Sequence, residues 1–186
     1  MNYRFTTILL TVALLLVIVV PSIQAAPSNP SKLAQVEVVA PAGNYDFTNH
    51  GTAWMPELPG KLDTNKPVGW GRAISPTLAG SYWVHIPIPF ATVLAGSAMK
   101  MQYIEFCAQS SNGVGGTKPV TMDLWENAGK FLTVPVVWAA NNSKQCFGYT
   151  FNPTVWHQDL GISVLLTFVN PADTITLYKA WVRVQP

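Results

Sequence analysis

Tryptophan is the residue type in this 186-residue sequence with the clearest capacity for ligand chemistry, and the chain has seven of them. A flat indole offers a face on which the C–H groups of a sugar ring can stack, while neighbouring polar side chains bind its hydroxyl groups. Trp54 and Trp70 lie in an irregular segment and Trp83 in an alternating one, and we predict ligand-binding roles for these three. Three further tryptophans lie in predicted strands, namely Trp125, Trp138 and Trp181. For those, packing in a core or an interface is the simpler interpretation.

Paired carboxylates are the second kind of chemistry to consider, because glycoside hydrolysis needs two of them about 5 to 9.5 Å apart across one cleft. Glu105 and Asp123 lie in predicted strands and Glu126 ends one, so two of them could project from the same sheet face. Glu105, however, shares its face with Cys107, which we expect to point outward. A secreted glycoside hydrolase-like enzyme is therefore only the third hypothesis, and no catalytic residue is predicted.

Histidine and aspartate side chains offer few metal-ligand combinations. The available ligands are His50, His85 and His157 with Asp46 or Asp159, and of these His157 and Asp159 stand two residues apart. A histidine in a surface loop explains that spacing equally well. The sequence contains neither the Gly-x-Ser-x-Gly motif of serine hydrolases nor a phosphate-binding loop. We therefore predict no metal site and no cofactor.

The two cysteines, Cys107 and Cys146, are expected to form one disulfide, because the chain is predicted to enter an oxidising compartment and each has a single possible partner. Around both, apolar residues alternate onto one face and the cysteine falls on the other. The pattern predicts two neighbouring strands of one sheet, linked on its outer side. Closing a loop of roughly 40 residues contributes about 3 to 4 kcal/mol in the chain-entropy model. A reactive thiol is the alternative, without a Cys–His pair to support it.

The first 25 residues have the pattern of a cleaved export signal. Arg4 gives a positive start, residues 8–20 form an almost unbroken apolar run, and small residues follow at 25 and 26. The run is shorter than the roughly 20 residues of a membrane-spanning helix, so a retained anchor is the less favoured alternative. We predict cleavage after Ala25 and a secreted protein, extracellular or at the cell surface, with the periplasm as another compartment.

Removal of the signal leaves about 160 residues, the length of one domain. Residues 26–32 are rich in Pro, Ser and Asn and are expected to be a disordered lead, and residues 33–186 to form a single domain. Charged residues make up 11% of the chain, and the formal net charge is +2. This near balance, with Lys and Arg scattered, argues against nucleic acid as a partner, and against a membrane once the signal is removed.

Alternation and turn residues predict roughly eight to ten strands and no helix after the signal. The clearest β-hairpin is predicted from Gly161 to Val184 about the loop Asn170-Pro171-Ala172-Asp173. Its first strand is apolar on both faces and is expected to be central, and its second to be less buried. A second hairpin is predicted from residues 120–126 and 131–138.

Other segments are less regular. Residues 33–39 are predicted as a first strand, and residues 81–89 alternate but contain two prolines, which predicts an edge strand. Residues 44–80 lose the periodicity, and we expect short strands hidden near 45–48 and 70–74.

The strands favour an all-β fold, an antiparallel two-sheet β-sandwich of jelly-roll character with one disulfide; a closed barrel is the structural alternative. Aromatic residues exceed what one core can cover. The leading hypothesis is therefore a non-enzymatic extracellular or cell-surface module that acts by binding or assembly, with copies of itself in a homo-oligomer, or an extracellular glycan or protein, as partner. The second hypothesis is a carbohydrate-binding module that uses Trp54, Trp70 or Trp83. Asn141 matches a glycosylation acceptor.

Overall fold

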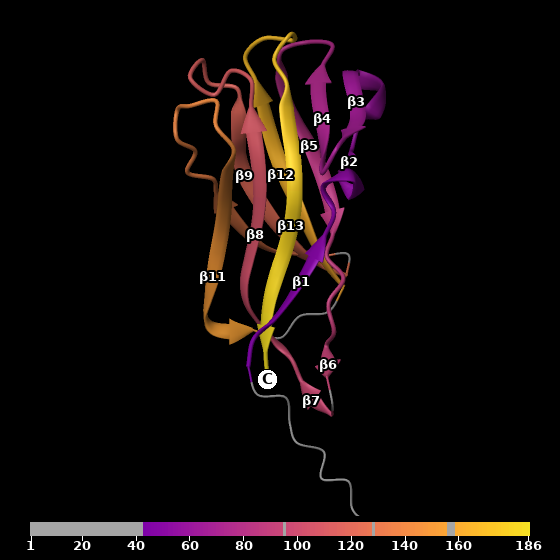
Figure 1. Cartoon of the computed structure of the whole chain (residues 1–186), viewed down its shortest axis with the longest axis vertical. Helices are drawn as coiled ribbons and strands as arrows, with labels where there is room; N and C mark the ends of the chain where they lie inside the picture. Colours follow the sequence, from indigo (N-terminus) through magenta and orange to yellow (C-terminus); the bar gives the residue numbers. More distant parts are fainter. Residues whose placement is uncertain (1–42, 95, 128, 156–158) are drawn as a thin grey trace, which may run out of the picture. The chain divides into compact units, whose positions relative to one another are not determined.

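Two antiparallel sheets packed face to face make up the part of the chain that the computed structural model describes, which is residues 43–94, 96–127, 129–155 and 159–186. In Figure 1 the strands of one sheet lie in front of those of the other. This arrangement confirms the predicted two-sheet β-sandwich. The predicted export signal, the lead and the first strand at 33–39 lie outside the described residues. Within those residues, no helix has the length and apolar character needed to cross a membrane.

Sheet A, the front sheet of Figure 1, has six strands. Their bounds are β1 Tyr45–Asn49, β3 Leu62–Val68, β4 Gly71–Pro76, β8 Lys100–Ser110, β11 Gln145–Val155 and β13 Ile175–Gln185. Their order is β11-β8-β13-β4-β3, and β1 pairs with the part of β13 that β4 leaves free.

Sheet B, behind it, has five strands. Their bounds are β2 Met55–Pro56, β5 Gly80–Pro87, β9 Lys118–Glu126, β10 Gly129–Pro135 and β12 Leu160–Phe168. Their order is β10-β9-β12-β5-β2. The remaining described elements are a small strand pair and two 3₁₀ turns: β6 Val93–Leu94, β7 Ser97–Ala98, η1 Gly51–Ala53 and η2 Pro59–Lys61.

The core lies between the sheets and is built from the inward residues of each strand. From β12 it takes Ile162, Val164, Leu166 and Phe168, all buried. Each such side chain stabilises the fold by about 1.5 to 3 kcal/mol relative to exposure. β12 is the middle strand of sheet B, which confirms its predicted central place; β13 is the middle strand of sheet A, and its less buried residues lie on the outward face.

The hairpin predicted for residues 161–184 is wrong, because β12 lies in sheet B and β13 in sheet A. The chain crosses between the sheets at the predicted loop, where Asp173 accepts hydrogen bonds from Asn112 and Thr117 of the loop between β8 and β9. It also crosses from β4 to β5, from β8 to β9 and from β11 to β12, which is the jelly-roll pattern. Asx and proline residues suit tight loops of either kind, so the local sequence does not indicate which sheet the next strand joins.

Besides the small β6–β7 pair, two direct hairpins occur among the described residues. β9 pairs with β10, which confirms the second predicted hairpin. β3 pairs with β4 through the two-residue turn Gly69-Trp70, with a φ of +51° at Gly69. β1 and β4 confirm the short strands expected near 45–48 and 70–74. β3 is a strand that the sequence did not predict, because an edge strand of polar residues and proline has no apolar alternation.

β5 has β12 along one side and, on the other, β2 over two residues. It therefore has an edge-like position over most of its length, as its two prolines predicted. Its inward residues Val84, Ile86 and the following Ile88 are buried, so its other residues form part of the outer face of sheet B.

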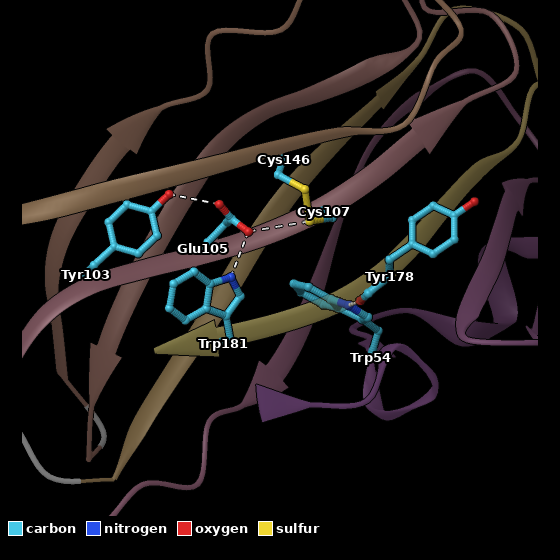
Figure 2. Close-up of a disulfide and its surroundings, with 7 residues drawn as sticks. All are labelled: Trp54, Tyr103, Glu105, Cys107, Cys146, Tyr178 and Trp181. Carbon is cyan, nitrogen blue, oxygen red and sulfur yellow. Dashed lines mark hydrogen bonds between the residues drawn. A yellow bond between two sulfur atoms is a disulfide. The ribbon is translucent and has the colours of Figure 1, made fainter. Parts of the chain in front are cut away.

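The predicted disulfide is confirmed. Cys107 and Cys146 are joined, with Cα atoms 4.0 Å apart, and are paired in the register of β8 and β11. Figure 2 shows the bridge beside these two strands. Their neighbours Phe106 and Phe147 pack in the core, so the bridge lies on the outer face of sheet A, also as predicted.

Candidate functional site

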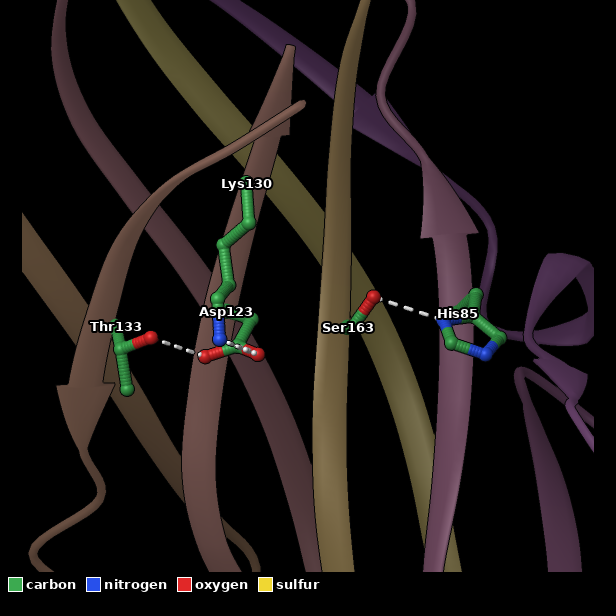
Figure 3. A network of polar contacts seen from close by, with 5 residues as sticks. All are labelled: His85, Asp123, Lys130, Thr133 and Ser163. Atoms are coloured by element: carbon green, nitrogen blue, oxygen red, sulfur yellow. Dashed lines mark hydrogen bonds and ion pairs between the residues drawn. The ribbon is translucent and has the colours of Figure 1, made fainter. Parts of the chain in front are cut away.

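A row of polar side chains crosses the outer face of sheet B. His85 of β5 stands opposite Ser163 of β12, which stands opposite Asp123 of β9, and Asp123 in turn stands opposite Thr133 of β10. Because side chains alternate along a strand and their neighbours fill the core, these residues point away from it. Figure 3 shows the row across neighbouring strands.

Hydrogen bonds hold this row. One joins His85 Nδ1 and Ser163 Oγ at 2.7 Å. Lys130 Nζ donates to Asp123 Oδ2 at 3.1 Å, and Thr133 Oγ1 donates to Asp123 Oδ1 at 2.7 Å. Asp123 and Ser163 are only 3% and 4% exposed although they face outward. Groups that are covered and paired in this way lose little freedom when a ligand arrives, so the row is preorganised.

Two tryptophans flank the row. Trp83 lies one outward position before His85 on β5, and Trp125 one outward position after Asp123 on β9. Trp125 stands opposite Gly161 of β12, which has no side chain to fill the space in front of it. The indole N–H of Trp125 is buried and has no hydrogen-bond partner among the described residues.

Two hollows adjoin along the row. One, of about 380 Å³, is lined by Trp83 and Lys130 among others, and the other, of about 420 Å³, by Gly161 among others. His85, Trp125 and Ser163 line both. The two hollows together are called the sheet B groove below. Its aromatic and polar lining residues are Glu57, Trp83, His85, Asp123, Trp125, Asn127, Lys130, Asp159 and Ser163.

The chemistry of the sheet B groove suits a ligand that carries many hydroxyl groups. Carboxylates such as that of Glu57 accept hydrogen bonds, Lys130 donates them, and the Asn127 amide does both. The indoles of Trp83 and Trp125 add apolar surface beside these groups. This mixture of a few polar groups with aromatic walls is typical of small-molecule sites.

The same row does not form a catalytic triad. In a triad the acid orients the histidine, and the histidine bonds the serine. Here Ser163 stands between His85 and Asp123, and both oxygens of Asp123 are bonded to Lys130 and Thr133 instead. Asp123 therefore cannot orient the imidazole.

The three predicted ligand-binding tryptophans lie at separate places. Trp54 is 0% exposed; it packs edge-on against Phe106, and its Nε1 donates to the Tyr178 carbonyl oxygen at 2.7 Å. It has no free face for a sugar, and the structure removes it from the candidates. Trp70 is 78% exposed at the tip of the β3–β4 hairpin, beside sheet A. Of the three, only Trp83 lines the sheet B groove.

Trp125 is the groove residue that the sequence reasoning assigned to packing. Its partner in the groove wall, Asp123, is separated from it by the buried Leu124, and Met122 is buried as well. This alternation already places Trp125 and Asp123 together on the face opposite the apolar one. The signal was therefore present, whereas Trp138 is buried in the core as expected.

The carboxylates considered for glycoside hydrolysis are not paired across a cleft. Glu105 lies on the outer face of sheet A and Asp123 on that of sheet B. Glu105 accepts hydrogen bonds from Trp181 Nε1 at 2.7 Å and from Tyr103 Oη at 2.9 Å, as Figure 2 shows. Burial and this carboxylate raise the pKa of Tyr103 to about 12. These contacts give Glu105 a structural role in sheet A.

One cluster of metal-ligating residue types occurs among the described residues, and it consists of Glu105, Cys107 and Cys146. Both sulfurs belong to the disulfide and are not thiolates, so they cannot serve as the soft ligands that such a site needs. The candidate ligand His157 lies outside the described residues.

No family model and no curated protein sequence matches this chain. Several solved structures resemble it distantly. The C-terminal CBM6 of LamC, a marine laminarinase from Zobellia galactanivorans, has 11% identity and a TM-score of 0.44 over 77% of this chain and 100% of that one. The xylan-binding module CBM86 from Roseburia intestinalis has 8% identity and a TM-score of 0.44 over 76% and 96%. A CBM4 structure has 15% identity and a TM-score of 0.45 over 74% and 90%. Likeness at this level says nothing of what this chain binds.

Proposed function

We propose that this protein is a non-enzymatic glycan-binding module and that the sheet B groove holds a neutral oligosaccharide. The single observation that carries the proposal is the groove itself, in which Trp83 and Trp125 flank a row of His85, Ser163 and Asp123, whose side chains are fixed by the hydrogen bond of His85 to Ser163 and by those of Asp123 to Lys130 and Thr133. Stacking on indole and hydrogen bonding to hydroxyl groups are the two interactions that a sugar ring offers.

A neutral ligand is favoured by the charges along the groove. Its lining includes the carboxylates of Glu57, Asp123 and Asp159 and one ammonium group, that of Lys130. Lys130 is already paired with Asp123. An anionic ligand would therefore meet the carboxylates of Glu57 and Asp159, which form no ion pair within the described part of the chain, whereas hydroxyl groups can bond to either sign of charge.

The extent of the groove supports an oligosaccharide over a single sugar. Trp83 and Trp125 lie two strands apart and about four residues apart along the strands, which places their Cα atoms roughly 16 Å from one another. A ligand that contacts both indoles must span that distance. Binding should therefore tighten as the oligosaccharide lengthens until both tryptophans are covered.

The test is binding of neutral soluble glycans to the wild-type protein and to Trp83→Ala and Trp125→Ala, measured by isothermal titration calorimetry. Each substitution should weaken binding about tenfold or more, since aromatic anchors dominate such sites. Trp70→Ala is the matched control, because Trp70 does not line the groove. Equal binding by all four proteins, or no binding of any neutral glycan by the wild type, would contradict the proposal.

Assembly with copies of itself is the second candidate function. It is supported by the exposed apolar side chains of Met55 and Leu58, which lie in and just after β2, beside the edge of β5 that β2 covers only in part. Light scattering of the protein in solution tests it. A monomer at all concentrations would exclude this candidate and leave the glycan proposal unaffected.

A further inference from the structure

Apart from the sheet B groove, a hollow of about 450 Å³ lies on the outer face of sheet A. It shares no lining residue with the sheet B groove. Its lining combines two aromatic residues with three side chains that can carry positive charge: Trp70, Tyr178, His50, Lys144 and Lys179. This set is called the Trp70 hollow below.

Trp70 is presented to solvent at the tip of a hairpin. It occupies the two-residue turn of the β3–β4 hairpin, and its ring lies 5.1 Å from that of His50, tilted by 53°. Gly51 beneath it has no room for a side chain, because a Cβ atom there would lie 2.5 Å from the Trp70 carbonyl oxygen. An indole that is 78% exposed offers a stacking surface for a flat or ring-shaped ligand.

No ion pair among the described residues neutralises the lysines of the Trp70 hollow. Its lining contains no carboxylate, and neither Lys144 nor Lys179 forms an ion pair within the described part of the chain. Lys144 Nζ lies 4.5 Å from the centre of the Tyr178 ring. The carboxylate of Asp46, which feels the charge of Lys179, is held by two hydrogen bonds from Arg183. The lining of the hollow is therefore positive and favours an anionic ligand.

We infer that the Trp70 hollow is a second binding site, for a sugar ring that carries an anionic group, with the ring on Trp70 and the anion between Lys144 and Lys179. A free inorganic anion would not use the exposed indole, and a neutral sugar would not use the two ammonium groups. A ring that bears a carboxylate or a sulfate uses both. The inference does not depend on the proposal for the sheet B groove, since the two sites have different residues and opposite charge.

The experiment measures binding of polygalacturonate, dextran sulfate and neutral dextran by affinity electrophoresis. The first two distinguish a carboxylate from a sulfate as the source of charge, and the third is the neutral control. Trp70→Ala should weaken binding of the acidic polymer about tenfold, and Lys144→Gln with Lys179→Gln about fivefold. Raising NaCl to about 0.5 M should weaken the wild type more than the double variant. All three side chains lie on the surface, so unchanged thermal unfolding midpoints are expected of these variants.

Two control variants make the result decisive. Lys61→Gln with Lys118→Gln removes the same net charge without touching the Trp70 hollow, and Trp83→Ala alters the sheet B groove and not the Trp70 hollow. Both should bind the acidic polymer as the wild type does. The inference is overturned if neither acidic polymer binds, if the control lysine pair weakens binding as much as Lys144 and Lys179 do, or if Trp83→Ala abolishes binding while Trp70→Ala does not.

Discussion

Removal of the Cys107–Cys146 disulfide should lower the free energy of unfolding by about 4 kcal/mol. The bridge joins residues 39 positions apart, and for a closed loop of that size the chain-entropy model gives about 4 kcal/mol near room temperature. The bridge also fixes β11, an edge strand of sheet A, to β8. For a domain of this length the loss corresponds to a fall in Tm of roughly 8 to 16 °C.

Cys107 is fully buried, so its replacement has a packing effect of its own. Cys107→Ala with Cys146→Ala should therefore be about 1 kcal/mol less stable than the reduced wild-type protein, in which both sulfurs remain. Equilibrium urea unfolding, followed by tryptophan fluorescence and circular dichroism, measures both differences. The slope with urea should also rise, because the unfolded chain without the cross-link exposes more surface.

A fall of less than about 1 kcal/mol in the free energy of unfolding on reduction of the disulfide would refute this reasoning. It would mean that the unfolded chain is already held compact without the bridge. A non-coincident transition by the two probes would show that β11 separates from sheet A before the rest unfolds, and the single free energy would then not apply.

Two further predictions concern the two outer faces. Gly161→Val should weaken neutral glycan binding at least about tenfold by filling the floor of the sheet B groove. The free energy of unfolding should stay equal or rise by up to about 1 kcal/mol, because a Cβ atom at this position meets Trp125 Cβ at an ordinary 3.8 Å. Calorimetry measures the binding and thermal unfolding the stability, and unchanged binding would show that Gly161 does not form the floor of the groove. The pKa of Tyr103 is raised from 10.0 to about 12, so the neutral form is favoured in the folded protein, and the resulting stability is constant below pH 10 and lost as the pH rises towards 12. In Tyr103→Phe the free energy of unfolding, measured with urea, should fall less steeply between pH 9 and 11.5 than in the wild type. An equal fall with pH in both proteins would contradict this account.

The local sequence pattern was sufficient to predict features that depend on one strand or one turn. The alternation around Cys107 and Cys146 predicts their shared outer face, and the polar turn at 127–129 predicts the β9–β10 hairpin, because both depend on nearest neighbours alone. The crossing from β12 to β13 depends instead on how two apolar strand faces meet across the core. The loop at Asn170–Asp173 has the same turn residues whether it joins strands of one sheet or of two, so the sequence could not decide it.

The candidate site was less predictable than the fold, for a related reason. Trp54 and Trp70 lie in the same irregular segment, yet one is fully buried and the other is 78% exposed. The difference arises from distant partners: Trp54 bonds to the Tyr178 carbonyl oxygen, 124 residues away, while Trp70 is at a hairpin tip. Trp83 and Trp125 line one groove only because β5 and β9 both pair with β12. Composition identifies tryptophans, whereas topology decides which of them share a surface.

The two outer faces differ in how their charges are balanced, and that difference gives them distinct responses to salt. On sheet B the buried carboxylate of Asp123 is matched by Lys130 and Thr133, and the ligand proposed for the groove carries no charge on which the exposed carboxylates of Glu57 and Asp159 could act. On sheet A the ammonium groups of Lys144 and Lys179 are exposed and unmatched in the described residues, so their field extends into solvent. Screening acts on exposed charges and much less on buried pairs. Ionic strength should therefore weaken an anionic ligand at the Trp70 hollow and leave a neutral one in the sheet B groove nearly unaffected, so that salt alone separates the two sites in one sample.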